Sequence, residues 1–202
     1  RGLGDVFKRQ VITIHELGLC TSQPIQTGTP RTFSRDNCVV TMTSTGTTAD
    51  LANNVVSLPD MNGRPASNTY SHAYIIITNT FGLRGSVSIQ NGSGDEVKYC
   101  SGTDGDSTAG TTAASGFCTA QDHTETLDDF GDGSFSAYFA PATMDGGGKV
   151  SALLTAADAN LTTATNTGEV ERLIGVFETN SGTPVVINNS TNGLEMQLTV
   201  TD

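Results

Sequence analysis

Short runs of apolar residues, separated by polar turns, recur along the whole chain. The clearest run covers residues 70–81, in which Tyr74 and Ile76 fall on one side of an extended backbone while Ile75 and Ile77 fall on the other. Alternation with a period of two is typical of a strand, and apolar residues on both sides indicate burial of both faces. The pattern therefore predicts a central strand.

Similar patterns, bounded by Gly, Pro, Asn and Asp, predict further strands. They cover residues 11–17, 39–43, 51–58, 85–90, 97–99, 135–139, 172–177, 183–188 and 194–200. Residues 149–161 fit either a helix or a strand followed by a turn. Gly82 is expected to end the central strand, so that residues 85–90 return beside it as a hairpin. Many short strands of this kind predict an all-β fold, a β-sandwich of Greek-key or jelly-roll type.

The domain organisation expected is an N-terminal extension over residues 1–18, followed by a single β-sandwich domain over residues 19–202. Residues 5–10 resemble Asp-Val-Tyr-Lys-Arg-Gln, the translated end of a sequencing adapter, and differ from it at Phe7. That resemblance implies that Arg1–Gln10 are not native and that the mature chain begins near Val11.

Composition narrows the possible partners. Charged residues make up 15% of the chain, and its formal net charge is −11. An acidic surface repels phosphate groups, which disfavours nucleic acids and anionic membranes as partners. No apolar stretch approaches the roughly 20 residues that a membrane-spanning helix needs. We therefore expect neither nucleic-acid binding nor membrane insertion.

The four cysteines form two local pairs with equal spacing, Cys20 with Cys38 and Cys100 with Cys118. Each pair brackets a polar, turn-rich segment, so two short-range disulfides are favoured among the three possible connectivities. A zinc site is disfavoured because no Cys-x-x-Cys spacing is present. Disulfides form in oxidising compartments, which predicts a secreted protein at the cell surface or outside the cell.

Few residues suggest chemistry. No Gly-x-Ser-x-Gly elbow is present, and His15, His72 and His123 lie in separate segments, so no catalytic residues, no bound organic cofactor and no enzymatic activity are predicted. Asp128, Asp129 and Asp132 lie in a Gly-containing run and are the candidate metal ligands, for calcium, because calcium prefers several hard oxygens on a tight turn. An acidic surface turn explains the same residues without a metal.

The segment Val11–Leu17 is apolar on both faces and lies close to one end of the chain. We expect that it lacks an adequate partner within its own chain and completes the sheet of a neighbouring copy. This architecture resembles secreted pilins that assemble by donor-strand complementation. The resemblance implies a structural or adhesive subunit of an extracellular homopolymer, either a pilus-like filament or a surface layer. Its assembly strand would contain Val11, Ile12, Ile14 and Leu17.

Two other functions fit the composition. A virion decoration or fibre protein can also be a Thr- and Gly-rich sandwich, although such proteins seldom need disulfides. A secreted module that binds glycan or calcium is the third possibility, and the absence of Trp weighs against a sugar site.

Overall fold

The computed structural model describes residues 6–51, 56–58, 62–90, 96–102, 120–144, 147–179 and 183–193. This part of the chain is almost entirely β-structure, and its only helical element is a short 3-10 turn, η1 (Thr167–Glu169). The strands are β1 (Val6–Cys20), β2 (Ile25–Gln26), β3 (Thr32–Phe33), β4 (Cys38–Asp50), β5 (Asn68–Tyr70), β6 (His72–Thr78), β7 (Thr80–Gln90), β8 (Glu96–Cys100), β9 (His123–Thr126), β10 (Tyr138–Thr143), β11 (Lys149–Thr155), β12 (Arg172–Glu178) and β13 (Val185–Ile187).

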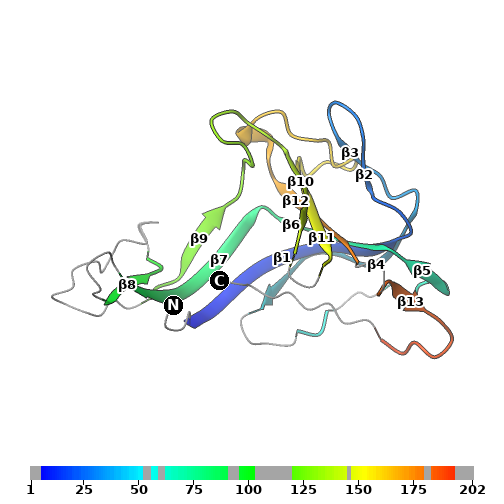
Figure 1. Ribbon diagram of the computed structural model, residues 1–202, viewed down its shortest axis with the longest axis horizontal. Coiled ribbons are helices and arrows are strands. Elements are labelled where there is room, and N and C mark those ends of the chain that lie inside the picture. Colours follow the sequence, from blue (N-terminus) through cyan, green and yellow to red (C-terminus); the bar gives the residue numbers. More distant parts are fainter. Residues whose placement is uncertain are drawn as a thin grey trace.

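Nine of these strands form one curled antiparallel sheet (Figure 1). Around the C-terminal half of β1 the strand order is β10-β11-β12-β6-β1-β4, and around its N-terminal half β1 lies between β4 and β7. Two short ribbons, β5 with β13 and β2 with β3, complete the described architecture. The all-β prediction is therefore confirmed, whereas the two-sheet sandwich stays a prediction.

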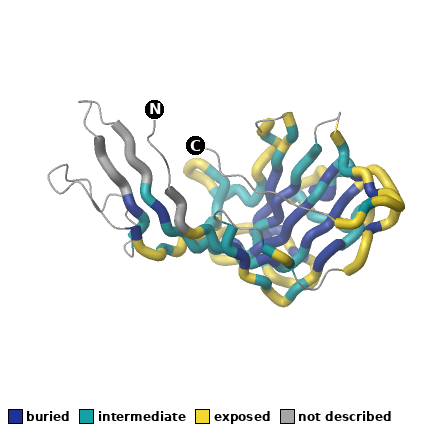
Figure 2. The backbone as a smooth tube through the Cα atoms, turned by 90° about the horizontal axis from the view of Figure 1, so that it is seen from below, coloured by how far each residue is buried: buried dark blue, intermediate teal, exposed yellow. Residues whose placement is uncertain are grey.

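The central strand is β6, and both of its faces are buried, as the alternation in the sequence predicted. Tyr74 and Ile76 belong to one apolar cluster, which the loop between β1 and β4 covers with Ile25 and Phe33. Ile75 and Ile77 belong to a second cluster on the opposite face, together with residues of β1 and β4. Figure 2 shows this buried core in dark blue, within a largely exposed outer layer.

The predicted hairpin between residues 70–81 and 85–90 is wrong. β6 and β7 follow each other with an interruption at Asn79, and both pair with the same side of β1. The side-chain amide of Asn79 donates to the carbonyl oxygen of Val170, which holds this interruption inside the protein. Gly82 lies opposite Val11 in β1, so it continues the strand rather than turning it. The true partner of residues 86–90 is β8.

Other sequence predictions have mixed outcomes. Residues 149–155 are the strand β11, so the strand interpretation of this segment is correct. β13 lies within the predicted strand at residues 183–188, but it pairs with β5. Its predicted hairpin partner, residues 194–200, lies outside the described residues.

Candidate functional site

β1 is the strand that sequence analysis assigned to assembly, and the structure places it inside the sheet of its own chain. Val11 is paired with Asp50 of β4 and Gly82 of β7, while Leu17 is paired with Met42 of β4 and Ile75 of β6. The prediction that this segment lacks a partner within its own chain is therefore wrong. The predicted domain boundary at residue 18 also falls inside β1, so residues 6–18 are part of the sheet.

Three of the four assembly residues named from the sequence face the core, whereas Val11 is only half-buried and lies outside the core cluster. Ile12, Ile14 and Leu17 are at most 9% exposed and join the cluster that contains Met42 and Ile77. Burial of one such aliphatic side chain stabilises a fold by about 1.5–3 kcal/mol. Without β1 this part of the core would expose apolar side chains to water, which is energetically unfavourable.

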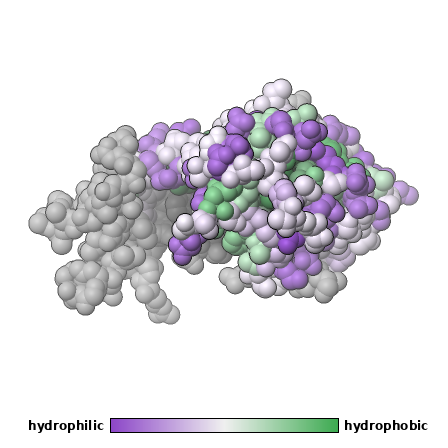
Figure 3. Space-filling model, turned by 90° about the horizontal axis from the view of Figure 1, so that it is seen from above, coloured by the Kyte–Doolittle hydropathy of each residue, from purple (hydrophilic) through white to green (hydrophobic). Residues whose placement is uncertain are grey.

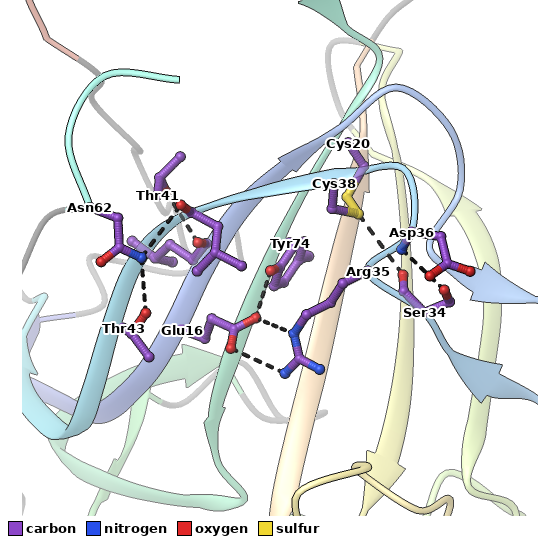
Figure 4. Close-up of polar contacts among 12 residues, drawn as sticks. Glu16, Cys20, Ser34, Arg35, Asp36, Cys38, Thr41, Thr43, Asn62 and Tyr74 are labelled. Atoms are coloured by element: carbon purple, nitrogen blue, oxygen red, sulfur yellow. Dashed lines mark hydrogen bonds and ion pairs between the residues drawn. A yellow bond between two sulfur atoms is a disulfide. The ribbon is translucent and has the colours of Figure 1, made fainter. Parts of the chain in front are cut away.

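The C-terminal half of β1 is covalently locked. A disulfide joins Cys20 to Cys38, the first residue of β4, and these two residues are direct cross-strand partners (Figure 4). This bond confirms the first of the two predicted disulfides. Because it ties the end of β1 to the start of β4, β1 cannot leave β4 at this end.

A polar cluster on the same half adds a second lock. The guanidinium of Arg35 donates to both carboxylate oxygens of Glu16, over 2.7 Å from Nε and 3.1 Å from Nη2. The hydroxyl of Tyr74 donates to Oε1 of Glu16 over 2.6 Å (Figure 4). β1, β6 and the loop before β4 each contribute one of these side chains, so the cluster holds that loop against the sheet.

The environment of the cluster stabilises its charge state. Hydrogen bonding to Glu16 raises the pKa of Arg35. Burial, reinforced by the hydrogen bond to Glu16, raises the pKa of Tyr74 far above its usual range. The cluster is thus a carboxylate held by a permanent cation and a neutral phenol. Each of the three side chains is hydrogen-bonded within the cluster, which is typical of a structural tie.

The ring of Phe33 packs against two members of the cluster, Tyr74 and Arg35. The ring of Phe33 meets the ring of Tyr74 edge to face at 5.1 Å between centroids, and the guanidinium of Arg35 lies over Phe33. Below the phenol ring lies Gly18, and a Cβ atom at this position would lie 2.3 Å from Cε1 of Tyr74. Only glycine leaves room for this ring.

The N-terminal half of β1 begins beyond an irregularity at His15. Between Ile14 and Glu16 the register shifts against both neighbours, β4 and β6. Against β6, two steps along β1 match one step along its partner, so His15 is the extra residue of a β-bulge. Residues Val11–Ile14 therefore belong to a separate stretch of ladder, which the Cys20–Cys38 bond does not hold directly.

The candidate calcium residues lie in the loop before β10. One carboxylate oxygen of Asp129 accepts the backbone N–H groups of Gly131 and Ser136, over 2.7 and 2.8 Å. The bonds from Ser136 and Gly131 lower the pKa of Asp129. In the described part of the chain, no three His, Cys, Asp or Glu side chains are grouped so that they could hold a metal ion. The structure does not gather Asp128, Asp129 and Asp132 into such a site.

We expect calcium to leave the melting temperature unchanged. Asp129→Ala should lower the melting temperature equally with and without calcium, because the two backbone N–H groups lose their acceptor. Asp132→Ala is the matched control, since Asp132 is an exposed acid of the same loop. Differential scanning fluorimetry with calcium or a chelator measures both. A calcium-dependent rise in melting temperature that either substitution abolishes would restore the metal site.

His72 and His123 make contacts with residues close to them in the chain. His123 contacts Glu125 at 2.7 Å in β9. His72 Nδ1 lies 2.9 Å from the hydroxyl of Ser71, and that hydroxyl also lies 3.0 Å from the carbonyl oxygen of Thr21. A hydroxyl has one hydrogen, and when Thr21 accepts it, His72 must donate to Ser71. In this arrangement His72 does not act as a base toward Ser71.

The second predicted disulfide stays a prediction. Cys100 is buried at the end of β8, and Cys118 lies outside the described residues.

No helix in the described part has the length and apolar character needed to cross a membrane. The Cys20–Cys38 disulfide is compatible with an extracellular protein.

Comparison with known proteins does not assign the chain to a family. No family model matches the chain, and no curated protein and no solved structure matches it either.

Sequence reasoning missed the Glu16–Arg35–Tyr74 cluster. The one signal for it was a carboxylate, Glu16, inside an otherwise apolar strand, because a charge in such a place requires a partner.

Proposed function

We propose that this protein is a structural subunit of an extracellular assembly of identical copies, a filament or a surface layer. In this proposal Val11–Ile14 is exchanged between neighbouring copies together with the residues of β1 that precede it, while Glu16–Cys20 stays in its own subunit. The observation that carries it is the division of β1 at His15 into one cross-linked half and one half held without a cross-link.

Strand exchange is favoured by the shape of the slot that Val11–Ile14 fills. Val11–Ile14 is paired with β4 along its whole length. On the other side Val11 is paired with β7 and Ile14 with β6, and Ile12 and Ile14 fill the core beneath the strand. An identical segment from a neighbour would make the same hydrogen bonds and the same apolar contacts. Exchange therefore costs little beyond the order lost at the hinge.

The contacts that hold the C-terminal half of β1 in its own subunit set the limit of the exchanged segment. The disulfide, the bidentate ion pair of Glu16 and Arg35, and the close contact of Gly18 with Tyr74 all lie on the C-terminal side of His15. Leu17, which sequence analysis included in the assembly strand, lies on this locked side. The assembly strand is thus reduced to Val11, Ile12 and Ile14.

The surface is consistent with a self-contained subunit. Polar side chains cover much of the face seen in Figure 3, with apolar patches between them. At the edge strand β10, the hydroxyl of Ser136 donates to the carbonyl oxygen of Tyr138, and Pro141 has no N–H to offer. These features disfavour assembly through this open edge and favour exchange of an internal strand.

A cysteine pair tests the exchange directly. Thr13 and Thr48 are direct cross-strand partners in β1 and β4. Cross-strand Cα atoms lie about 4.5–5.5 Å apart, within the range that a disulfide accepts. We expect a mixture of Thr13→Cys chains and Thr48→Cys chains to form covalent heterodimers on oxidation, because only an exchanged strand brings the two positions together.

The matched control replaces Thr48→Cys with Thr45→Cys. Thr45 is an exposed residue of the same strand, but it lies in the irregular stretch of β4 and has no partner position in β1. Non-reducing electrophoresis and intact mass measure the heterodimers, and negative-stain microscopy shows whether fibres or layers accompany them. Equal yields from the two mixtures, or no heterodimer from either, would contradict strand exchange.

A further inference from the structure

His15 is the only residue at which β1 leaves its ladder with both neighbours at once, within the described part of the strand. Its Nε2 atom lies 2.9 Å from the hydroxyl of Thr78 in β6. On the other side lies Gly46 of β4, whose backbone has a φ of +140°, and a Cβ there would approach Cε1 of His15 to 3.4 Å. The imidazole therefore lies between β4 and β6, at the point where the two halves of β1 meet.

We propose that protonation of His15 opens this bulge and releases Val11–Ile14 for exchange between copies. This inference rests on the proposed function and adds its regulation: assembly would start when the protein meets a mildly acidic environment.

The surroundings of His15 disfavour a positive charge. Partial burial and the nearby cation of Arg172 on β12 lower its pKa below the ordinary value of 6.5, and a hydrogen bond with the backbone of Ser44 acts in the opposite direction. β6 presents Thr78 and β4 presents Ser44 and Gly46, none of which ionises in this range. Arg172 is thus the charged neighbour that acts on the ring.

The stability of the closed bulge depends on pH because the closed and open states bind a proton at His15 with different affinity. A histidine whose pKa is lowered in the closed state stabilises that state fully above pH 6.5. As the pH falls below this value, the open state binds a proton more readily than the closed state does. The closed bulge therefore weakens in acid.

His72 provides the matched control. Burial also lowers its pKa, with Glu178 acting upward and Lys149 downward. His72 is paired with Cys20 at the locked end of β1, so its protonation would strain the fold without freeing Val11–Ile14. Acid should thus act on exchange through His15 and not through His72.

The experiment uses the same cysteine mixture. Thr13→Cys and Thr48→Cys chains are incubated together at about pH 5.5 or about pH 8, across the range in which histidine titrates. Both samples are then returned to neutral pH and oxidised, so that the thiol chemistry is identical. We expect the acid-treated sample to yield several-fold more heterodimer. His15→Gln in both chains should abolish this difference, and His72→Gln should retain it.

A second variant keeps the test independent of the folding of His15→Gln. Thr78→Val removes the hydroxyl that holds the ring, so it should raise heterodimer yield at neutral pH. Equal yields at the two pH values in chains that retain His15, or an acid-dependent rise that survives in His15→Gln, would overturn the role of His15. Absence of heterodimer at every pH would instead refute strand exchange itself, together with the proposed function.

Discussion

Replacing Cys20 and Cys38 with serine is expected to lower the free energy of unfolding by about 3 kcal/mol. The bond closes a loop across a sequence separation of 18 residues, and removing it frees that loop in the unfolded chain. Urea denaturation followed by circular dichroism measures the change as a lower midpoint. Cys20 is fully buried, so the paired serines also place polar groups where no water reaches.

The control for this double variant is Ser22→Ala, which changes an exposed residue of the same loop. Its effect should stay within about 0.5 kcal/mol, as for most surface substitutions. A double variant as stable as the wild type would show that the Glu16–Arg35–Tyr74 cluster holds this end of β1 without covalent help. Loss of the bond should also let a longer part of β1 exchange, which would raise heterodimer yield.

Gly18→Ala is expected to destabilise the fold by about 1–3 kcal/mol, the usual cost of overfilling a packed core. The new methyl group would lie 2.3 Å from Cε1 and 2.5 Å from Cζ of Tyr74. The ring cannot move away easily, because its hydroxyl is bonded to Glu16 and the ring itself packs against Phe33. Thermal or urea denaturation measures the loss.

Two further variants isolate the cause of this loss. Gly193→Ala is the matched control, since a Cβ at that exposed position meets nothing within 4 Å. In the Tyr74→Leu background, Gly18→Ala should cost clearly less, because residues in contact are not additive. An undiminished cost in that background would mean that the backbone at residue 18, and not the tyrosine ring, demands glycine.

The apolar pattern identified strands well where a strand is buried on both faces. In β6 the alternation of Tyr74 and Ile76 with Ile75 and Ile77 assigned each residue to the correct face, because pleating fixes which side chains point together. The spacing of Cys20 and Cys38 likewise predicted their bond. Both signals are local and need no knowledge of distant partners.

Pairing between distant strands was harder to predict. Gly82 suggested a turn, but opposite Val11 it extends the long ribbon that β1 forms with β6 and β7. Glycine permits turns without requiring them, and the neighbour decides which is used. The acidic run at Asp128–Asp132 suggested calcium, but the backbone of the loop itself occupies a carboxylate oxygen of Asp129.

The sequence by itself determined that this chain is built of strands, that the strand at Tyr74–Ile77 is buried on both faces, and that Cys20 and Cys38 bridge a local loop. These properties follow from side-chain periodicity and short-range spacing. Only the tertiary structure decided where β1 finds its partners and that His15 divides it into a locked and an unlocked half. That division depends on register against two strands that lie far away in the chain, and side-chain periodicity does not encode register between distant segments.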